Sequence, residues 1–169
     1  MIYRVSTWMR PVREDPQVLA IFCSGGRYTR YVDEFLEGCL RHEGADWLAV
    51  PGGPAVLAGR AVEEVDEAYA WREIEFLVEA HTVREMVLIF HEDCGHYRRH
   101  LGTAWTPELE KSLQAGDAAV AATRVSARFP GVQVLAYREF VDDPAVYFEP
   151  LAPGPEPSVA TAHAPLPPQ

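Results

Sequence analysis

The chain has 169 residues, 48% of them hydrophobic and 24% charged, so a single globular domain with a sizeable core is expected. Fifteen basic against twenty-five acidic residues give a formal net charge of −10, which disfavours partners such as nucleic acids and anionic membrane surfaces. No apolar run approaches the roughly 20 residues that span a bilayer, and the N-terminus lacks the apolar stretch of a secretory signal. Three cysteines are too few for a disulfide scaffold. We therefore expect a soluble cytoplasmic protein.

The first half of the chain alternates between short apolar runs and a helical pattern. Residues 18–22 predict a buried strand, and a second strand is expected over 46–50. Between them, apolar residues recur at three- and four-residue spacing from Tyr28 to Leu40, which predicts one apolar helix face. Cys39 lies on this stripe, so it is expected in the core.

The second half continues the alternation. A helix is expected over 62–81 and a strand over 85–90, and Thr106 and Pro107 indicate the start of a helix that reaches residue 129. Residues 132–137 predict a fourth strand. Strands that are apolar throughout and alternate with helices indicate an α/β fold with a mainly parallel sheet flanked by helices. In the helix over 62–81, the expected inward residues are Val65, Tyr69, Phe76, Leu77 and Ala80.

One change of composition divides the chain. Eight prolines lie between Pro144 and the last residue, so this segment is expected to be an extended or disordered tail, with a more apolar first part. We predict three parts: an N-terminal arm over 1–17, a metal-binding α/β domain over 18–149 and a Pro-rich C-terminal tail over 150–169.

Two cysteines and a histidine follow two of the predicted strands. Cys23 comes directly after 18–22, and His91 and Cys94 come after 85–90. If these strands are neighbours in a parallel sheet, both loops open at the same edge. Two thiolates and an imidazole suit zinc, and three protein ligands leave one tetrahedral position open. Free cysteine is also common as a small buried apolar residue, so the spacing alone leaves both interpretations open.

The residues around these positions resemble a known family. Cys-Ser-Gly-Gly-Arg at 23–27 and His-Glu-Asp-Cys-Gly at 91–95 are similar to the two zinc motifs of the β-class carbonic anhydrases, Cys-x-Asp-x-Arg and His-x-x-Cys-Gly. The helix and strand that lead to His91 also resemble that family. The resemblance covers roughly residues 18–96 and implies one zinc ion per chain, bound by Cys23, His91 and Cys94.

The first motif departs from the family at one position. Gly25 stands where the family has Asp, whereas Arg27 is retained. In the family this Asp pairs with the Arg and accepts a hydrogen bond from zinc-bound water, or binds the zinc in a closed state. Arg27 is therefore expected to hold the loop, and Asp93 is a candidate to replace the missing carboxylate. Loss of such a group commonly lowers activity or affinity by ~10–100-fold.

The resemblance implies reversible hydration of carbon dioxide to bicarbonate by zinc-bound hydroxide, in a homodimer or a dimer of dimers. Two alternatives stay open: a related zinc hydrolase of carbonyl sulfide or carbon disulfide, and a zinc-binding paralogue that has lost turnover and serves a regulatory role. A dithiol redox protein that uses Cys23 and Cys94 would leave His91 and Gly95 without a role.

Overall fold

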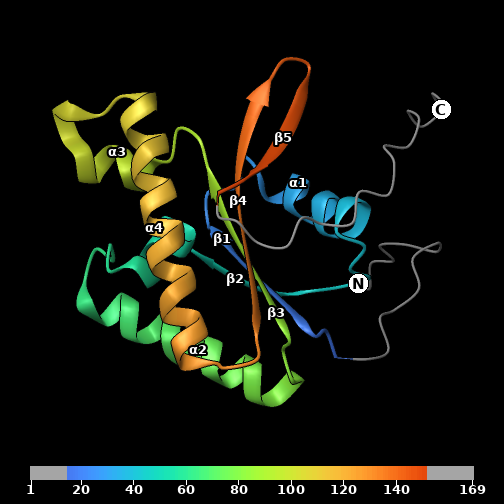
Figure 1. Ribbon diagram of the computed structural model, residues 1–169. Helices are drawn as coiled ribbons and strands as arrows, with labels where there is room; N and C mark the ends of the chain where they lie inside the picture. Colours follow the sequence, from blue (N-terminus) through green and yellow to red (C-terminus); the bar gives the residue numbers. More distant parts are fainter. Residues whose placement is uncertain (1–14, 152–169) are drawn as a thin grey trace, which may run out of the picture.

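The computed structural model describes residues 15–151, so most of the predicted arm (1–17) and of the predicted tail (150–169) lies outside the described residues. Its centre is a five-stranded sheet in the order β2-β1-β3-β4-β5 (Figure 1). The first four strands are parallel, and β5 is antiparallel to β4. The predicted α/β class with a mainly parallel sheet is confirmed. The strands are β1 (Val18–Cys23), β2 (Asp46–Val50), β3 (Glu85–His91), β4 (Gln133–Asp142) and β5 (Ala145–Pro150).

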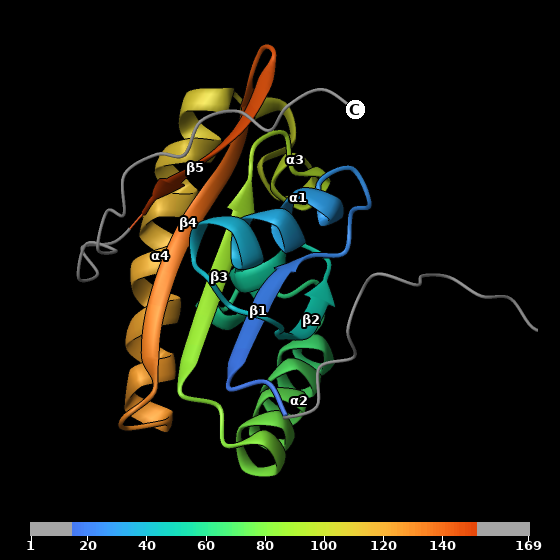
Figure 2. The same cartoon turned by 90° about the vertical axis from the view of Figure 1, so that its right-hand side faces the viewer.

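Helices cover both faces of this sheet. Figure 1 shows α2 and α4 on one face and α1 on the other, and Figure 2 looks onto the α1 side. No helix within residues 15–151 is both long and apolar enough to cross a membrane. The helical elements are α1 (Thr29–Glu34), the π-helical turn η1 (Phe35–Cys39), the 3₁₀ segment η2 (Gly53–Ala58), α2 (Glu64–His81), α3 (Gly95–Leu101), the 3₁₀ turn η3 (Gly102–Ala104) and α4 (Pro107–Arg128).

The core has two parts because side chains alternate between the two faces of each strand. Leu88 and Phe90 of β3 pack with α2, α4 and η2, whereas Val87 and Ile89 pack with α1. Tyr137 of β4 belongs to the α1 side and contacts Phe35 edge-to-face. The carboxyl ends of the parallel strands therefore lie between the layer formed by α2, α4 and η2 on one face and the short helix α1 on the other.

The start of α4 agrees with the sequence. The Thr106 hydroxyl accepts a hydrogen bond from the Leu109 backbone N–H at 3.1 Å, and Pro107 occupies the first helical position. A capping side chain stabilises a helix start because it pairs an N–H that has no partner within the helix. The predicted strands over 18–22, 85–90 and 132–137 are each longer in the structure, and the strand over 46–50 has the predicted bounds.

The predicted inward face of α2 is wrong. Val65 is 70% exposed and Phe76 is 63% exposed, and Tyr69 and Ala80 are exposed too. Only Leu77 of the predicted set packs against the core, together with the buried residues Ala70, Trp71 and Ile74. Because α2 carries apolar residues on two faces, their spacing is compatible with either face turned inward, and contact with the sheet selects the face with Trp71 and Ile74.

The expected core position of Cys39 is also wrong, since Cys39 is exposed. The helix that begins at Thr29 changes to a π-helical turn at Phe35, where the backbone N–H of Leu40 bonds to the Phe35 carbonyl. A π-helical turn has more residues than an α-helical one, so positions after it rotate away from the expected face. Phe35 and Leu36 stay buried and Cys39 turns to solvent.

The Pro-rich segment begins with a strand. Residues 145–150 pair antiparallel with 137–142, whereas the sequence predicts an extended or disordered segment from Pro144 on, with no strand in it. The correction has a physical reason: β5 lies at the edge of the sheet, where a proline such as Pro150 is tolerated at the strand end. Phe148 stacks on Phe35 with ring centroids 4.0 Å apart, so the apolar part of this segment completes the α1 side of the core. The division of the chain into arm, domain and tail stays a prediction.

Candidate metal centre

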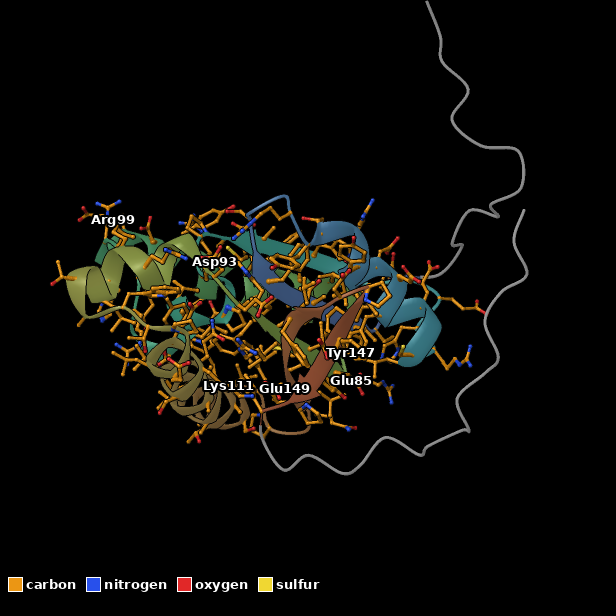
Figure 3. All side chains as sticks on the ribbon, turned by 90° about the horizontal axis from the view of Figure 1, so that it is seen from above. Glu85, Asp93, Arg99, Lys111, Tyr147 and Glu149 are labelled. Atoms are coloured by element: carbon orange, nitrogen blue, oxygen red, sulfur yellow. The ribbon has the colours of Figure 1, made fainter. Side chains whose placement is uncertain are left out.

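Two neighbouring strands bring the three predicted ligands together. Cys23 is the last residue of β1 and His91 the last residue of β3, and these strands pair directly. Cys94 follows in the loop before α3, as its N-terminal flanking residue. The ligand atoms of Cys23, His91 and Cys94 all lie within 4.8 Å of one another, and the two sulfurs are 3.9 Å apart. Figure 3 looks from above onto this edge of the sheet, where Asp93 is labelled.

The His91 ring has the orientation of a metal ligand. Its Nδ1 lies 2.7 Å from the Glu92 carbonyl oxygen, which can only accept, so Nδ1 carries the proton and Nε2 keeps its lone pair. The Nε2 atom is buried and has no hydrogen-bond partner among the described residues. Tyr28 packs against the ring with centroids 4.9 Å apart. An imidazole fixed through one nitrogen, with the other nitrogen free and buried, is typical of a ligating histidine.

The two thiols differ in acidity. The Cys94 thiol donates a hydrogen bond to the Cys23 sulfur, and this bond lowers the pKa of the Cys23 thiol, with His91 acting in the same direction. The same hydrogen bond, together with burial, raises the pKa of the Cys94 thiol. The site therefore holds one thiolate readily, and the second proton leaves when a cation replaces it. Two sulfurs and an unpartnered imidazole nitrogen fit zinc and leave one position for another ligand.

Helix α4 supports the loop that carries Cys94. The buried Glu110 carboxylate accepts hydrogen bonds from the Cys94 backbone N–H at 2.8 Å and from the Trp105 ring N–H at 2.7 Å. One turn later, the Gln114 side-chain amide donates to the His91 carbonyl oxygen at 2.8 Å. Helix α4, which lies outside both sequence motifs, therefore holds this loop at His91 and at Cys94.

Replacing Glu110 by leucine is expected to lower the free energy of unfolding by about 2–4 kcal/mol, because it leaves the buried Cys94 N–H and the partly buried Trp105 N–H without this partner. Chemical denaturation of the metal-free protein measures this, and zinc titration should show weaker binding as the Cys94 loop loosens. Glu108→Leu is the matched control, since Glu108 is exposed in the same helical turn. Equal losses in both variants would mean that the contacts of Glu110 do not stabilise the loop.

Arg27 and Asp93 join the two loops above the ligands. The guanidinium of Arg27 donates to the Asp93 side chain at 3.0 Å and to the Asp93 carbonyl oxygen at 2.7 Å. The second carboxylate oxygen of Asp93 bonds to Arg98. These guanidinium groups, Arg27 first, lower the pKa of Asp93. The structure thus gives Arg27 a carboxylate partner, from the loop of the second motif.

No family model and no curated protein matches the sequence. Among solved structures, the fold is similar to a β-carbonic anhydrase from Trichomonas vaginalis at 14% identity, with a TM-score of 0.51 over 84% of this chain and 87% of that one. The fold is that of the β-class carbonic anhydrases. Carbonic anhydrases from Glaciozyma antarctica (16% identity, TM-score 0.49, 84% of this chain and 85% of that one) and Streptococcus mutans (18%, 0.46, 85% and 87%) are also similar.

Gly25, where the resemblance to the Cys-x-Asp-x-Arg motif leads one to expect Asp, leaves room for a side chain. A Cβ atom built on Gly25 would lie 3.7 Å from the Cys23 sulfur, in ordinary contact, and would meet no other atom that closely. The backbone there does not need glycine, since its φ lies outside the left-handed range. Glycine at position 25 therefore leaves the space beside the Cys23 sulfur without a side chain, although the backbone there would accept one.

The close approach of the β1 backbone requires glycine at position 53. At φ +56°, its Cβ would lie 2.8 Å from the Cys23 nitrogen and 2.8 Å from the Phe22 carbonyl carbon. Gly53→Ala is expected to lower the thermal midpoint and weaken zinc binding, since it combines left-handed strain of about 1–2 kcal/mol with displacement of Cys23. Calorimetry and zinc titration measure the two effects. Gly26→Ala, with no atom within 4 Å, is the control, and a Gly53→Ala protein as stable as this control would contradict the prediction.

Sequence reasoning missed Glu139, which lies next to the ligands. It pairs with His91 across β3 and β4, and it lines a small cavity together with Cys23, His91 and Tyr28. Glu139 is 1% exposed, and burial raises the pKa of its carboxyl to about 8. In the sequence, Glu139 continues the alternation of the apolar residues in the predicted strand over 132–137. That predicted strand ends two residues before Glu139, so the carboxyl is not expected as part of it.

The two histidines after the second motif have different surroundings. His96 is half-buried beside Gly52, and burial lowers the pKa of its imidazole. His100 is exposed and lies 3.0 Å from the Arg60 guanidinium, consistent with a surface residue. Neither belongs to the group of three ligand residues.

Proposed function

We propose that this chain is a zinc-dependent member of the β-carbonic anhydrase family that hydrates carbon dioxide reversibly to bicarbonate. The convergence of Cys23, His91 and Cys94, with a buried and unpartnered His91 Nε2, carries the proposal. These residues would hold one zinc ion per chain. When bound, zinc lowers the pKa of a coordinated water towards ~7 and so supplies a nucleophile at neutral pH.

The chain's own residues would set the surroundings of this reaction. The Glu92 carbonyl holds the His91 tautomer, and Glu110 holds the Cys94 backbone. The Arg27–Asp93 pair would fix the two ligand loops relative to each other, as Arg27 reaches across from the first loop to the second. Apolar side chains wall the adjacent cavity and would exclude bulk water from a nonpolar linear substrate; they are Phe22, Val32 and Ile89.

The exposed apolar stripe on α2 supports a homodimer. Val65, Tyr69 and Phe76 recur at helical spacing, and Trp47 on the edge strand β2 is 45% exposed. Several large apolar side chains exposed on one helix are typical of a protein interface. We propose a second copy of this chain as the partner, as the family resemblance implies. We also propose the cytoplasm as the compartment, since all three cysteines are unpaired.

A stopped-flow hydration assay on metal-quantified protein tests the proposed activity. The expected result is one zinc per chain and hydration above the rate of buffer that contains the same zinc concentration. Zinc binding without hydration would favour one of the alternatives. Carbonyl sulfide and carbon disulfide as substrates then distinguish the related hydrolase from a paralogue with a regulatory role.

A further inference from the structure

Glu139 is a buried carboxyl at the end of an apolar row. Side chains alternate along β4, so Glu139 shares the α1 face with Leu135 and Tyr137, which both pack in the core there. Its backbone carbonyl accepts from the Glu92 N–H at 3.0 Å, which fixes the strand beside the second motif. The sequence thus places an ionisable side chain where this face of the sheet meets the ligands.

The carboxyl faces a cavity with room for one small molecule. The cavity measures about 10 Å³, close to the space that one water molecule needs. Two of the three ligand residues line it, and the rest of the wall is mostly apolar. The lining residues are Phe22, Cys23, Tyr28, Thr29, Val32, Ile89, His91 and Glu139. A molecule held there would contact the carboxyl on one side and the ligand group on the other.

The Oε1 atom of Glu139 has no hydrogen-bond partner among the described residues and is buried. The neighbouring carboxylates are occupied elsewhere: Glu92 accepts from the Val141 N–H, and Asp93 is bonded to two arginines. Arg138, next along β4, points to the other face and bonds to Gln114 and Glu149. Burying a polar group without a partner is costly, so a bound molecule is the natural partner of Oε1.

We propose that Glu139 hydrogen-bonds the small exogenous ligand of the metal centre, and that it selects ligands that can place an O–H group in the cavity, such as water and bicarbonate, over linear anions that carry no hydrogen. The inference rests on the proposed function, because it needs a metal in the Cys23–His91–Cys94 group. It assigns to Glu139 a contact that the residue at position 25, a glycine, cannot make. Asp93 keeps the separate task of pairing with Arg27.

Cobalt(II)-substituted protein tests this, because thiolate ligation gives visible bands that shift when an anion binds. Dissociation constants for bicarbonate and thiocyanate are measured at one fixed pH of about 9, where an ionised carboxyl can only accept hydrogen bonds. In Glu139→Leu, the constant for bicarbonate is expected to rise about tenfold relative to that for thiocyanate, since only bicarbonate loses a hydrogen bond. Glu139→Gln keeps an acceptor and is expected to restore most of the selectivity. Glu149→Leu, which removes a carboxylate outside the cavity, should leave the ratio unchanged.

The metal-free proteins give an independent readout. Because leucine suits an apolar wall better than an unpartnered carboxyl, Glu139→Leu is expected to raise the thermal midpoint, whereas a purely structural Glu139 would lower it. An unchanged anion ratio in a Glu139→Leu protein that binds cobalt would overturn the inference and leave the proposed function standing. Absence of thiolate–cobalt bands in the unsubstituted protein would contradict both.

Discussion

Cys94→Ser is expected to abolish stoichiometric zinc binding and to reduce hydration to the buffer rate. The substitution removes one of two sulfur donors and leaves His91 and a single thiol, too few soft ligands for a stable site. Because the pKa of the Cys94 thiol is raised, zinc must displace a proton there, so zinc affinity of the unsubstituted protein should increase with pH. Metal analysis after dialysis and a competitive chelator titration measure both effects.

Cys39→Ser provides the matched control, since Cys39 is the third cysteine and is exposed away from the ligand group. It should bind one zinc per chain and hydrate carbon dioxide at the rate of the unsubstituted protein. If Cys94→Ser retained full zinc occupancy, the metal would have to lie elsewhere, and the assignment of all three ligands would fail.

The convergence of Cys23, His91 and Cys94 could be predicted from sequence because it depends on one topological condition. Cys23 and His91 end strands that sequence patterns identify, and these strands need only be neighbours for the loops to meet. The apolar runs that form β1 and β3 also require burial on both faces, so a parallel sheet followed directly.

The parts that sequence reasoning missed depend on contacts between distant segments. Glu110 looks like an ordinary first-turn acid of α4, and only the packing of α4 on the sheet places its carboxylate at the Cys94 N–H. The inward face of α2 and the π-helical turn before Cys39 are likewise decided by neighbouring elements, not by spacing. Local periodicity therefore predicts the elements, and tertiary packing decides which side chain each one presents.

Gly25→Asp is expected to raise carbon dioxide hydration and to introduce an inactive form at low pH. The structure has room for the side chain beside the Cys23 sulfur, where a carboxylate can orient an incoming ligand or bind the metal itself. Hydroxide competes better with a carboxylate ligand as pH rises, so the closed form should disappear with increasing pH. A gain of about 10-fold, within the range for such supporting groups, is expected in stopped-flow rates above that transition.

Gly26→Asp is the control for Gly25→Asp, because it adds the same charge one residue away, where a Cβ atom would meet nothing within 4 Å. Its rate and pH profile should match those of the unsubstituted protein. If Glu139 already contacts the ligand, Gly25→Asp should give a larger gain in the Glu139→Leu background than alone, because the two carboxyls would then serve the same ligand. Additive effects would show that they act on different steps, and no gain in either background would direct the search for the missing carboxylate to Asp93→Asn.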